Sequence, residues 1–206
     1  MTQYTNIEIF PTILWKTNLD YTFDEDEREL ISGSLDNPKQ NAYGNLQSQE
    51  TYLLNNPKLL SFKKVLTVCA QEFFDYIHRP EHPFEIYITQ SWTNLTKKDV
   101  SHGRHYHPNS FISGVFYYQT TDKDYCQFTD PLAGSHQLTI PTIQHERYNS
   151  RLWDIPVGNN DLLLFLSTVQ HEVPKKEHPG DRISLAFNTF IKGDLGREID
   201  LTSLKL

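Results

Sequence analysis

The sequence predicts a mainly β fold with flanking helices, in which a jelly-roll core is backed by an N-terminal helical part. Two observations support this prediction. Residues 84–192 contain a series of short segments in which β-branched and aromatic residues alternate with polar ones between turn residues, and this pattern is typical of antiparallel sandwiches and barrels. Helical periodicity occurs only before these segments, as expected for a β core covered by helices on one side.

The length of the chain is that of one domain. With 206 residues, it buries roughly 70% of its unfolded surface and needs neither a disulfide nor a metal in order to fold. We therefore expect a single domain over residues 1–206, with helical support over about residues 1–82 and the jelly-roll core over about residues 84–192.

Composition excludes several classes of partner. The net charge is −7 and the basic residues form no dense cluster, so nucleic acid is not an expected partner. No apolar run approaches ~18 residues, so no membrane span is expected, and the N-terminal MTQYTNIEIFPTILW does not have the pattern of a signal peptide. Cys69 and Cys126 are the only cysteines, which favours two buried thiols in the reducing cytoplasm.

The first segments of the chain mix strand and helix signals. Residues 7–13, with three isoleucines around Pro11, predict a short edge strand, because proline is tolerated at sheet edges. Asp24 and Glu27 have the spacing of a capping box and predict a short helix that ends towards residue 35.

A polar loop and a strong helix follow. Residues 37–50 are rich in Asn and Gln and predict a loop. Asn56 can cap a helix whose first position is Pro57, and apolar residues then recur at gaps of three and four as far as His78. This helix is expected to pack on the outside of a sheet.

Seven segments after residue 83 predict the strands of the core. FEIYITQSWTNL and FISGVFYYQ alternate and are rich in β-branched and aromatic residues. Five more short segments follow at turn-separated spacing: YCQFTD, HQLTIPTI, RLWDIPV, DLLLFLS and RISLAFNTFI.

Three histidines at the ends of these segments predict a metal site. His105 and His107 are two residues apart, and on a strand that spacing places both imidazoles on one face. His171 follows the apolar segment DLLLFLSTVQ, and in a jelly roll its strand can neighbour the one that carries His105. Since neutral imidazole is the commonest metal ligand, the three side chains can converge on one ion.

The order of these elements resembles the iron(II)- and 2-oxoglutarate-dependent oxygenase superfamily. The resemblance is closest to a group of bacterial and phage 2OG-Fe(II) oxygenases, and the segments that carry it are QSWTNL, HYHPNSFISGVFYY, FTDP, DLLLFLSTVQHEV and RISLAFN. It covers roughly residues 84–192, about half of the chain. It implies a double-stranded β-helix, the cupin-like form of the jelly roll, and a cytoplasmic protein, in the host cytoplasm if a phage encodes it.

The resemblance also implies the ligands of an iron(II) ion. The superfamily uses two histidines and one carboxylate, with open positions for oxoglutarate and oxygen, whereas His107 occupies the acidic position here. We expect His105, His107 and His171 to be the ligands. Asp130, which follows the next strand segment, is the fallback for His107.

A 2-oxoglutarate site follows from the same resemblance. Arg182, on the strand after the distal histidine, is expected to bind the distal carboxylate as a bidentate, charge-assisted pair. Ser184, two residues further on, and Tyr117, on the strand after the HxH motif, are expected to assist. Asn94 and Asn188 are expected to add polar contacts to the co-substrate.

The predicted function is that of a dioxygenase of the hydroxylase type that uses iron(II) and 2-oxoglutarate. It would act on a small-molecule or peptide substrate and release succinate and CO2. Two alternatives remain. A three-histidine cupin dioxygenase, which uses no oxoglutarate, would suit His107 but would not need Arg182, Ser184 or Tyr117. A non-catalytic jelly-roll binding module would need none of these residues.

Overall fold

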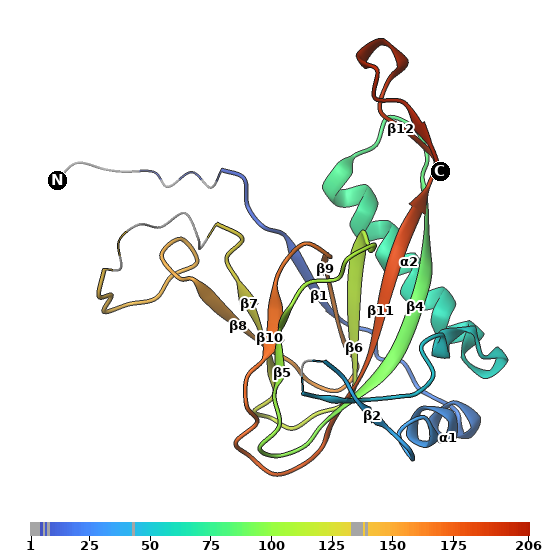
Figure 1. Cartoon of the computed structure of the whole chain (residues 1–206), viewed down its shortest axis with the longest axis vertical. Helices are drawn as coiled ribbons and strands as arrows, with labels where there is room; N and C mark the ends of the chain where they lie inside the picture. Colours follow the sequence, from blue (N-terminus) through green and yellow to red (C-terminus); the bar gives the residue numbers. More distant parts are fainter. Residues whose placement is uncertain (1–4, 6, 8, 43, 133–137, 139) are drawn as a thin grey trace.

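Two antiparallel sheets face each other, and the helices lie outside the larger one (Figure 1). The structure is a computed structural model that describes residues 5, 7, 9–42, 44–132, 138 and 140–206. The larger sheet has the order β1 (Leu14–Asn18), β9 (Asp161–Leu166), β6 (Ile112–Gln119), β11 (Arg182–Lys192), β4 (Glu85–Thr96), β3 (Leu46–Gln47) and β2 (Lys39–Gln40). The smaller sheet has the order β5 (His102–His105), β10 (His171–Val173), β7 (Tyr125–Thr129) and β8 (Leu152–Pro156).

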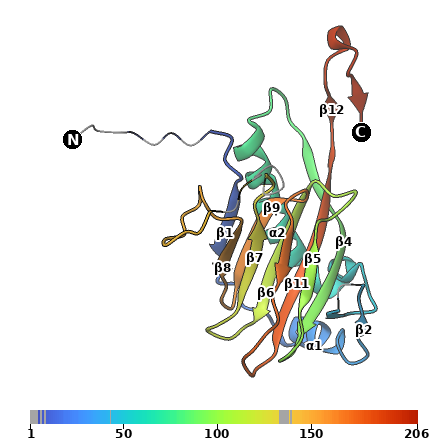
Figure 2. The ribbon, with the colours of Figure 1, turned by 60° about the vertical axis from the view of Figure 1, so that its left-hand side comes forward.

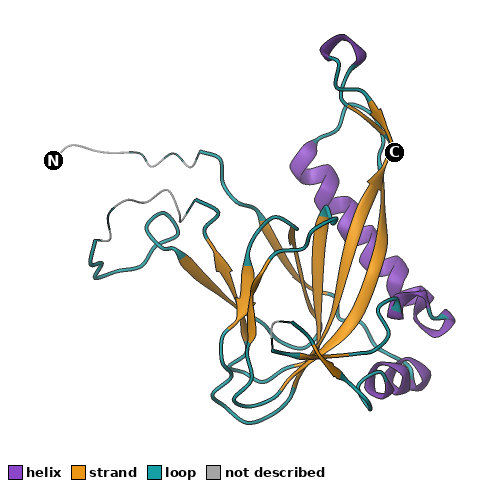
Figure 3. Ribbon diagram, in the orientation of Figure 1, coloured by secondary structure: helices purple, strands orange, loops and turns teal. Residues whose placement is uncertain are grey.

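The course of the chain between the sheets is that of a jelly roll (Figure 3). Strands β4, β6, β9 and β11 belong to the larger sheet and β5, β7, β8 and β10 to the smaller one, so the chain winds both sheets into a double-stranded β-helix. The longest ladder joins β11 to β4, from the pair Arg182–Thr96 to the pair Lys192–Glu85. The predicted fold class is confirmed.

The main helix covers the outer face of the larger sheet (Figures 1 and 2). The chain enters it through two 3-10 turns, η1 (Leu53–Asn55) and η2 (Pro57–Leu59), and Asn56 Oδ1 accepts a hydrogen bond from Lys58 N at 3.0 Å. Helix α2 (Leu60–His78) then ends at the predicted residue. Its apolar stripe shares one buried cluster with the outer face of the larger sheet, formed among others by Phe62, Leu66, Phe73, Ile86, Phe116, Leu164 and Phe187.

The first helix begins at the predicted capping box. In α1 (Glu25–Gly33), Asp24 Oδ1 accepts from Glu27 N at 2.8 Å, and the Glu27 carboxylate accepts from Asp24 N at 2.9 Å. Beyond β11 the chain ends in a projecting hairpin, β12 (Asp194–Leu195) and β13 (Leu204–Lys205), with the 3-10 turn η4 (Glu198–Asp200) between them (Figure 2). Within the described residues, no helix is both long enough and apolar enough to cross a membrane.

A second buried cluster fills the space between the two sheets. It joins inward-facing residues of both sheets, including Val115, Tyr117, Cys126, Phe128, Leu163, Phe165 and Ala186. These residues form the apolar surroundings of the candidate site.

Two predicted elements of the N-terminal part were wrong. The edge strand is β1, which pairs with β9 and packs on α2 through Trp15, whose ring lies 5.3 Å from that of Phe73. Residues 7 and 9–13 have no strand structure, and residue 8 of the predicted strand lies outside the described residues. Residues 37–50 are not only a loop: they include β2 and β3, and β3 pairs with β4. Two of the polar residues in this segment, Asn45 and Ser48, form hydrogen bonds to β4.

The segment HQLTIPTI does not form the predicted strand where it is described. Residues 138 and 140–143 have no strand structure, and residues 136, 137 and 139 lie outside the described part. Leu138, Ile140 and Ile143 are exposed, so their apolar side chains have no sheet partner that would hold them in a strand.

Candidate metal and co-substrate site

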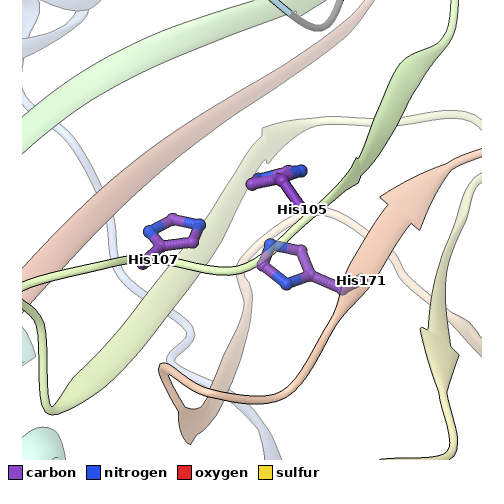
Figure 4. A group of neighbouring side chains, drawn as sticks. All are labelled: His105, His107 and His171. Atoms are coloured by element: carbon purple, nitrogen blue, oxygen red, sulfur yellow. The ribbon is translucent and has the colours of Figure 1, made fainter.

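Three histidines from two strands and one loop meet between the sheets (Figure 4). His105 ends β5 and is paired directly with His171, the first residue of β10. His107 lies beyond the end of β5 rather than on it, so the prediction of one shared strand face was wrong; its backbone N–H instead donates to Ser167 O at 3.0 Å. One nitrogen from each ring lies within 4.8 Å of the other two.

The hydrogen bonds of the three rings set their tautomers. Each Nδ1 faces an oxygen that can only accept: Gly103 O lies 2.8 Å from His105, Asn188 Oδ1 lies 2.5 Å from His107, and Val169 O lies 3.2 Å from His171. Each ring is therefore protonated at Nδ1 and presents its lone pair at Nε2. This is how outer hydrogen bonds orient histidines that bind a metal through Nε2.

Burial keeps the three imidazoles neutral. It lowers the pKa of His107 to about 4 and that of His171 well below its ordinary value. The pKa of His105 is lowered by the same cause. A histidine must be neutral to bind a metal, so all three are in the required state at neutral pH.

The buried Nε2 atom of His107 has no hydrogen-bond partner in the part of the chain that the structure describes. An unpaired buried nitrogen is costly, and a metal ion at the centre of the cluster would satisfy it. Three imidazoles that leave positions open suit iron(II) or another first-row divalent ion. The residues present therefore fit the metal that the sequence predicts.

The nearby carboxylates have other partners. Asp130 Oδ1 accepts from Leu132 N at 2.9 Å within a turn. Glu172 follows His171 but faces away from the cluster, where it pairs with Arg104 at 2.7 Å. Among the described residues the metal-type cluster consists of histidines alone.

A buried arginine lies at the start of β11. Arg182 is 5% exposed, its Nη1 donates to Tyr125 O at 2.9 Å, and its guanidinium lies 5.3 Å from the centre of the Tyr117 ring. Its Nε has no hydrogen-bond partner, and no carboxylate forms an ion pair with it within the described ranges. A buried cation without a counter-charge is unfavourable, so the guanidinium is suited to an anionic ligand.

The other predicted co-substrate residues lie next to Arg182 in the sheet. Ser184 is paired with Asn94 on one side and with Tyr117 on the other, so the three share one row. Burial raises the pKa of Tyr117 well above its ordinary value, and its buried hydroxyl has no conventional hydrogen-bond partner among the described residues. The nearby Cys126 thiol, whose pKa burial raises to about 11, is only a weak partner.

Asn188 differs from this group. Its Oδ1 atom accepts the Nδ1 proton of His107, so its side chain supports a histidine of the cluster rather than the row beside Arg182. The role predicted for Asn188 in co-substrate binding stays a prediction, whereas its contact with His107 was not foreseen.

Residues 90–188 match the protein family described as "Putative 2OG-Fe(II) oxygenase". The matched part runs from β4 to β11 and includes the three histidines and Arg182. Over slightly less than half of its length, the chain is therefore similar to the 2OG-Fe(II) oxygenases. The resemblance predicted from the sequence is thus confirmed.

Solved structures of the superfamily share this fold at low sequence identity. An oxidoreductase of the 2OG-Fe(II) oxygenase family from Burkholderia pseudomallei has 15% identity and a TM-score of 0.56, with 85% of this chain and 84% of that chain covered. HygX from Streptomyces hygroscopicus, with nickel and 2-oxoglutarate bound, has 13% identity and a TM-score of 0.54, with 86% and 82% covered. A prolyl-4-hydroxylase from Pseudomonas putida has 15% identity and a TM-score of 0.53, with 87% and 94% covered. A search of curated proteins found no match.

Two further residues of the candidate site were not predicted from the sequence. His102 stacks on His105 with ring centres 4.3 Å apart, and Asn45 reaches Asn94 from the β2–β3 hairpin. The HGRH spacing gave no reason to place His102 beside the cluster, and nothing in an Asn- and Gln-rich segment distinguishes Asn45. The position of Asn45 follows only from the pairing of β3 with β4.

Proposed function

We propose that this chain is an iron(II)- and 2-oxoglutarate-dependent dioxygenase that hydroxylates a small-molecule or peptide substrate and releases succinate and CO2. The observation that carries the proposal is the buried Arg182, which has no carboxylate partner among the described residues and shares the space between the sheets with a cluster of neutral histidines. A dicarboxylate with a 2-oxo group can satisfy both, because one end pairs with the arginine and the other reaches a metal.

Charge supports this assignment. Three neutral imidazoles leave the full charge of a divalent metal uncompensated, and Arg182 adds a second buried cation. Oxoglutarate brings two negative charges, one for each of these centres. The keto acid end would thus supply at the metal the negative charge that a carboxylate ligand supplies in the ordinary triad.

Each residue then has a defined role. His105, His107 and His171 would hold iron(II), which, when bound, supplies the redox chemistry that couples oxygen reduction to the decarboxylation of oxoglutarate. Arg182 would bind the distal carboxylate through two charge-assisted hydrogen bonds. Tyr117, protonated because of its burial, and Ser184 would donate hydrogen bonds to the same group.

The similar structures are consistent with a 2-oxoglutarate-dependent hydroxylase. HygX was solved with nickel and 2-oxoglutarate bound, and the Pseudomonas putida protein is a prolyl-4-hydroxylase. At their low identity these structures support the fold, and the assignment of co-substrate and reaction rests on the residues above.

The alternative is a three-histidine dioxygenase that oxidises a thiol without oxoglutarate. The third histidine, His107, favours it, since such enzymes lack the carboxylate ligand. Arg182, Tyr117 and Ser184 argue against it, because a reaction without a dicarboxylate has no use for a buried cation with two neighbouring donors.

The test is calorimetric titration of oxoglutarate into iron(II)-loaded protein under nitrogen. Arg182→Leu should weaken oxoglutarate binding by roughly 100-fold or more, since each charge-assisted bond contributes about 1.5–3 kcal/mol, while metal content is retained. Arg197→Leu, which removes an exposed arginine of the C-terminal hairpin, is the matched control. Wild-type protein that binds the metal but not oxoglutarate would refute the proposal in favour of the three-histidine alternative.

Succinate formation and metal content complete the test. Wild-type protein should convert oxoglutarate to succinate with iron(II) and oxygen, faster when a true substrate is present. His105→Ala and His171→Ala should each reduce the metal content to background. Full metal occupancy in both variants would place the metal elsewhere.

A further inference from the structure

The β2–β3 hairpin continues the inner face of the larger sheet beside the candidate co-substrate residues. Gln47 of β3 is paired with Asn94 of β4, and Leu46 with Leu95. Asn45 precedes Leu46, so it lies on the same face of the sheet as Gln47, and continuing this register places it next to Thr96. Thr96 is in turn paired with Arg182. Asn45, Thr96 and Arg182 therefore form a row across three neighbouring segments, and this row begins in the hairpin.

The Asn45 side chain is held between two residues of β4. It is 0% exposed, its Nδ2 donates to Asn94 Oδ1 at 3.3 Å, and its Oδ1 accepts from Thr96 Oγ1 at 3.0 Å. Its own backbone N–H is fixed by Asn41 Oδ1 at 3.1 Å. Both ends of the amide are thus used for contacts with β4, and neither can turn to another partner without losing a buried hydrogen bond.

The same hairpin reaches the smaller sheet. Asn41 Nδ2 contacts His102 Nε2 at 3.3 Å, and the His102 ring stacks on His105 with centres 4.3 Å apart. The hairpin therefore crosses the edge at which β4 and β5 would otherwise leave the barrel open (Figure 1). It contacts the row of Arg182 at one end and a strand of the histidine cluster at the other.

We propose that Asn45 is a positioning residue of the oxoglutarate pocket and acts through Asn94. Because Asn94 Oδ1 accepts from Asn45, the amide of Asn94 is fixed with its oxygen towards the hairpin, and its NH2 group stays available to a ligand beside Ser184, with which Asn94 is paired. This orientation presents an N–H donor to a carboxylate bound at Arg182. The inference rests on the proposed function, since it assigns Asn45 a part in binding the same co-substrate.

The experiment compares oxoglutarate affinity with metal affinity in iron(II)-loaded Asn45→Ala. Oxoglutarate binding should weaken roughly tenfold, because Asn94 loses the buried hydrogen bond that orients its amide. The metal affinity should stay unchanged. Ser48→Ala is the matched control: Ser48 is equally buried and bonds to β4 through the backbone N–H of Thr93, but touches neither Asn94 nor Thr96. It should leave both affinities unchanged.

A double-mutant cycle with Asn94→Ala separates positioning from general stability. If Asn45 acts through Asn94, the double variant should bind oxoglutarate no more weakly than Asn94→Ala alone. Additive losses, or an unchanged oxoglutarate affinity in Asn45→Ala, would overturn the inference. If Asn45→Ala does not fold, as judged by thermal unfolding, Asn45→Ser takes its place under the same criteria.

Failure of the inference is distinguishable from failure of the proposed function. Wild-type protein that binds oxoglutarate, and loses it in Arg182→Leu, upholds the proposed function whatever Asn45 does. Wild-type protein without oxoglutarate affinity overturns both.

Discussion

Replacing Asn188 by leucine should weaken metal binding while leaving the fold intact. Asn188 Oδ1 is the acceptor for His107 Nδ1 at 2.5 Å, and His107 is 8% exposed, so water cannot readily take over this hydrogen bond. Leucine would leave the Nδ1–H group buried and unpaired, at a cost of about 1–3 kcal/mol. It would also release the ring orientation that presents Nε2 to the metal.

The expected loss of iron(II) affinity is roughly 10- to 100-fold, the range typical of outer hydrogen bonds to histidine ligands. That range corresponds to about 1.4–2.8 kcal/mol and agrees with the cost of the unpaired donor. Asn188→Asp keeps an acceptor in place, so it should retain most of the affinity. Iron(II) titration under nitrogen, in competition with a chromophoric chelator, measures all three proteins.

Ser184→Ala is the control for the Asn188 variants, because Ser184 lies on the same strand and faces the same side of the sheet. It should leave the metal affinity unchanged and weaken only oxoglutarate binding. A metal affinity within twofold of wild type in a folded Asn188→Leu variant would refute the reasoning. A selective loss of oxoglutarate affinity in that variant would instead return Asn188 to the co-substrate role predicted from the sequence.

Two predictions concern stability. Burial lowers the pKa of His107 to about 4, below the ~6.5 of an exposed histidine, so the unfolded metal-free chain binds more protons between these values and stability falls as the pH decreases. The free energy of unfolding, measured by urea titration, should be lower at about pH 5 than at pH 7 by on the order of 2 kcal/mol for this residue, and the decrease should be smaller in His107→Gln. Equal free energies at the two pH values would contradict this. Lys176→Met should cost about 3–5 kcal/mol in urea unfolding, because it removes the lysine at 2.7 Å from Asp124, a carboxylate that is only 3% exposed. Lys175→Met, which removes an exposed pair with Asp99, should cost less than ~1 kcal/mol, and similar losses in both lysine variants would be inconsistent with a buried pair.

The core of the fold was predictable because its strands have a strong local pattern. Alternating or continuous runs of apolar residues mark β4, β6, β9 and β11, and the histidine and arginine at the ends of such segments indicated which strand ends meet. The pairing of His105 with His171 is the direct result of that topology.

The parts that were missed depend on contacts distant in sequence. His107 leaves the strand because Ser167 and Asn188 hold its backbone and its ring, and no local signal reports those partners. The β2–β3 hairpin was missed because its strands have only two residues each and the buried residues that flank β3, Asn45 and Ser48, are polar. The patterns used for prediction assume that buried residues are apolar. Polar residues that are paired in the fold look the same in the sequence as polar residues in solvent.

The segment that follows Asn45 also protects the protein against self-association. Without it, one side of the long strand β4 would present a row of unpaired N–H and C=O groups, which is a template for adding a strand from another molecule. Ser48 N donates to Thr93 O at 3.0 Å and Ser91 N donates to Thr51 O at 2.9 Å, so an irregular stretch of chain occupies that edge without itself forming a long strand. Damage to this stretch would therefore show first as aggregation of a folded protein, before any loss of its hydrophobic core.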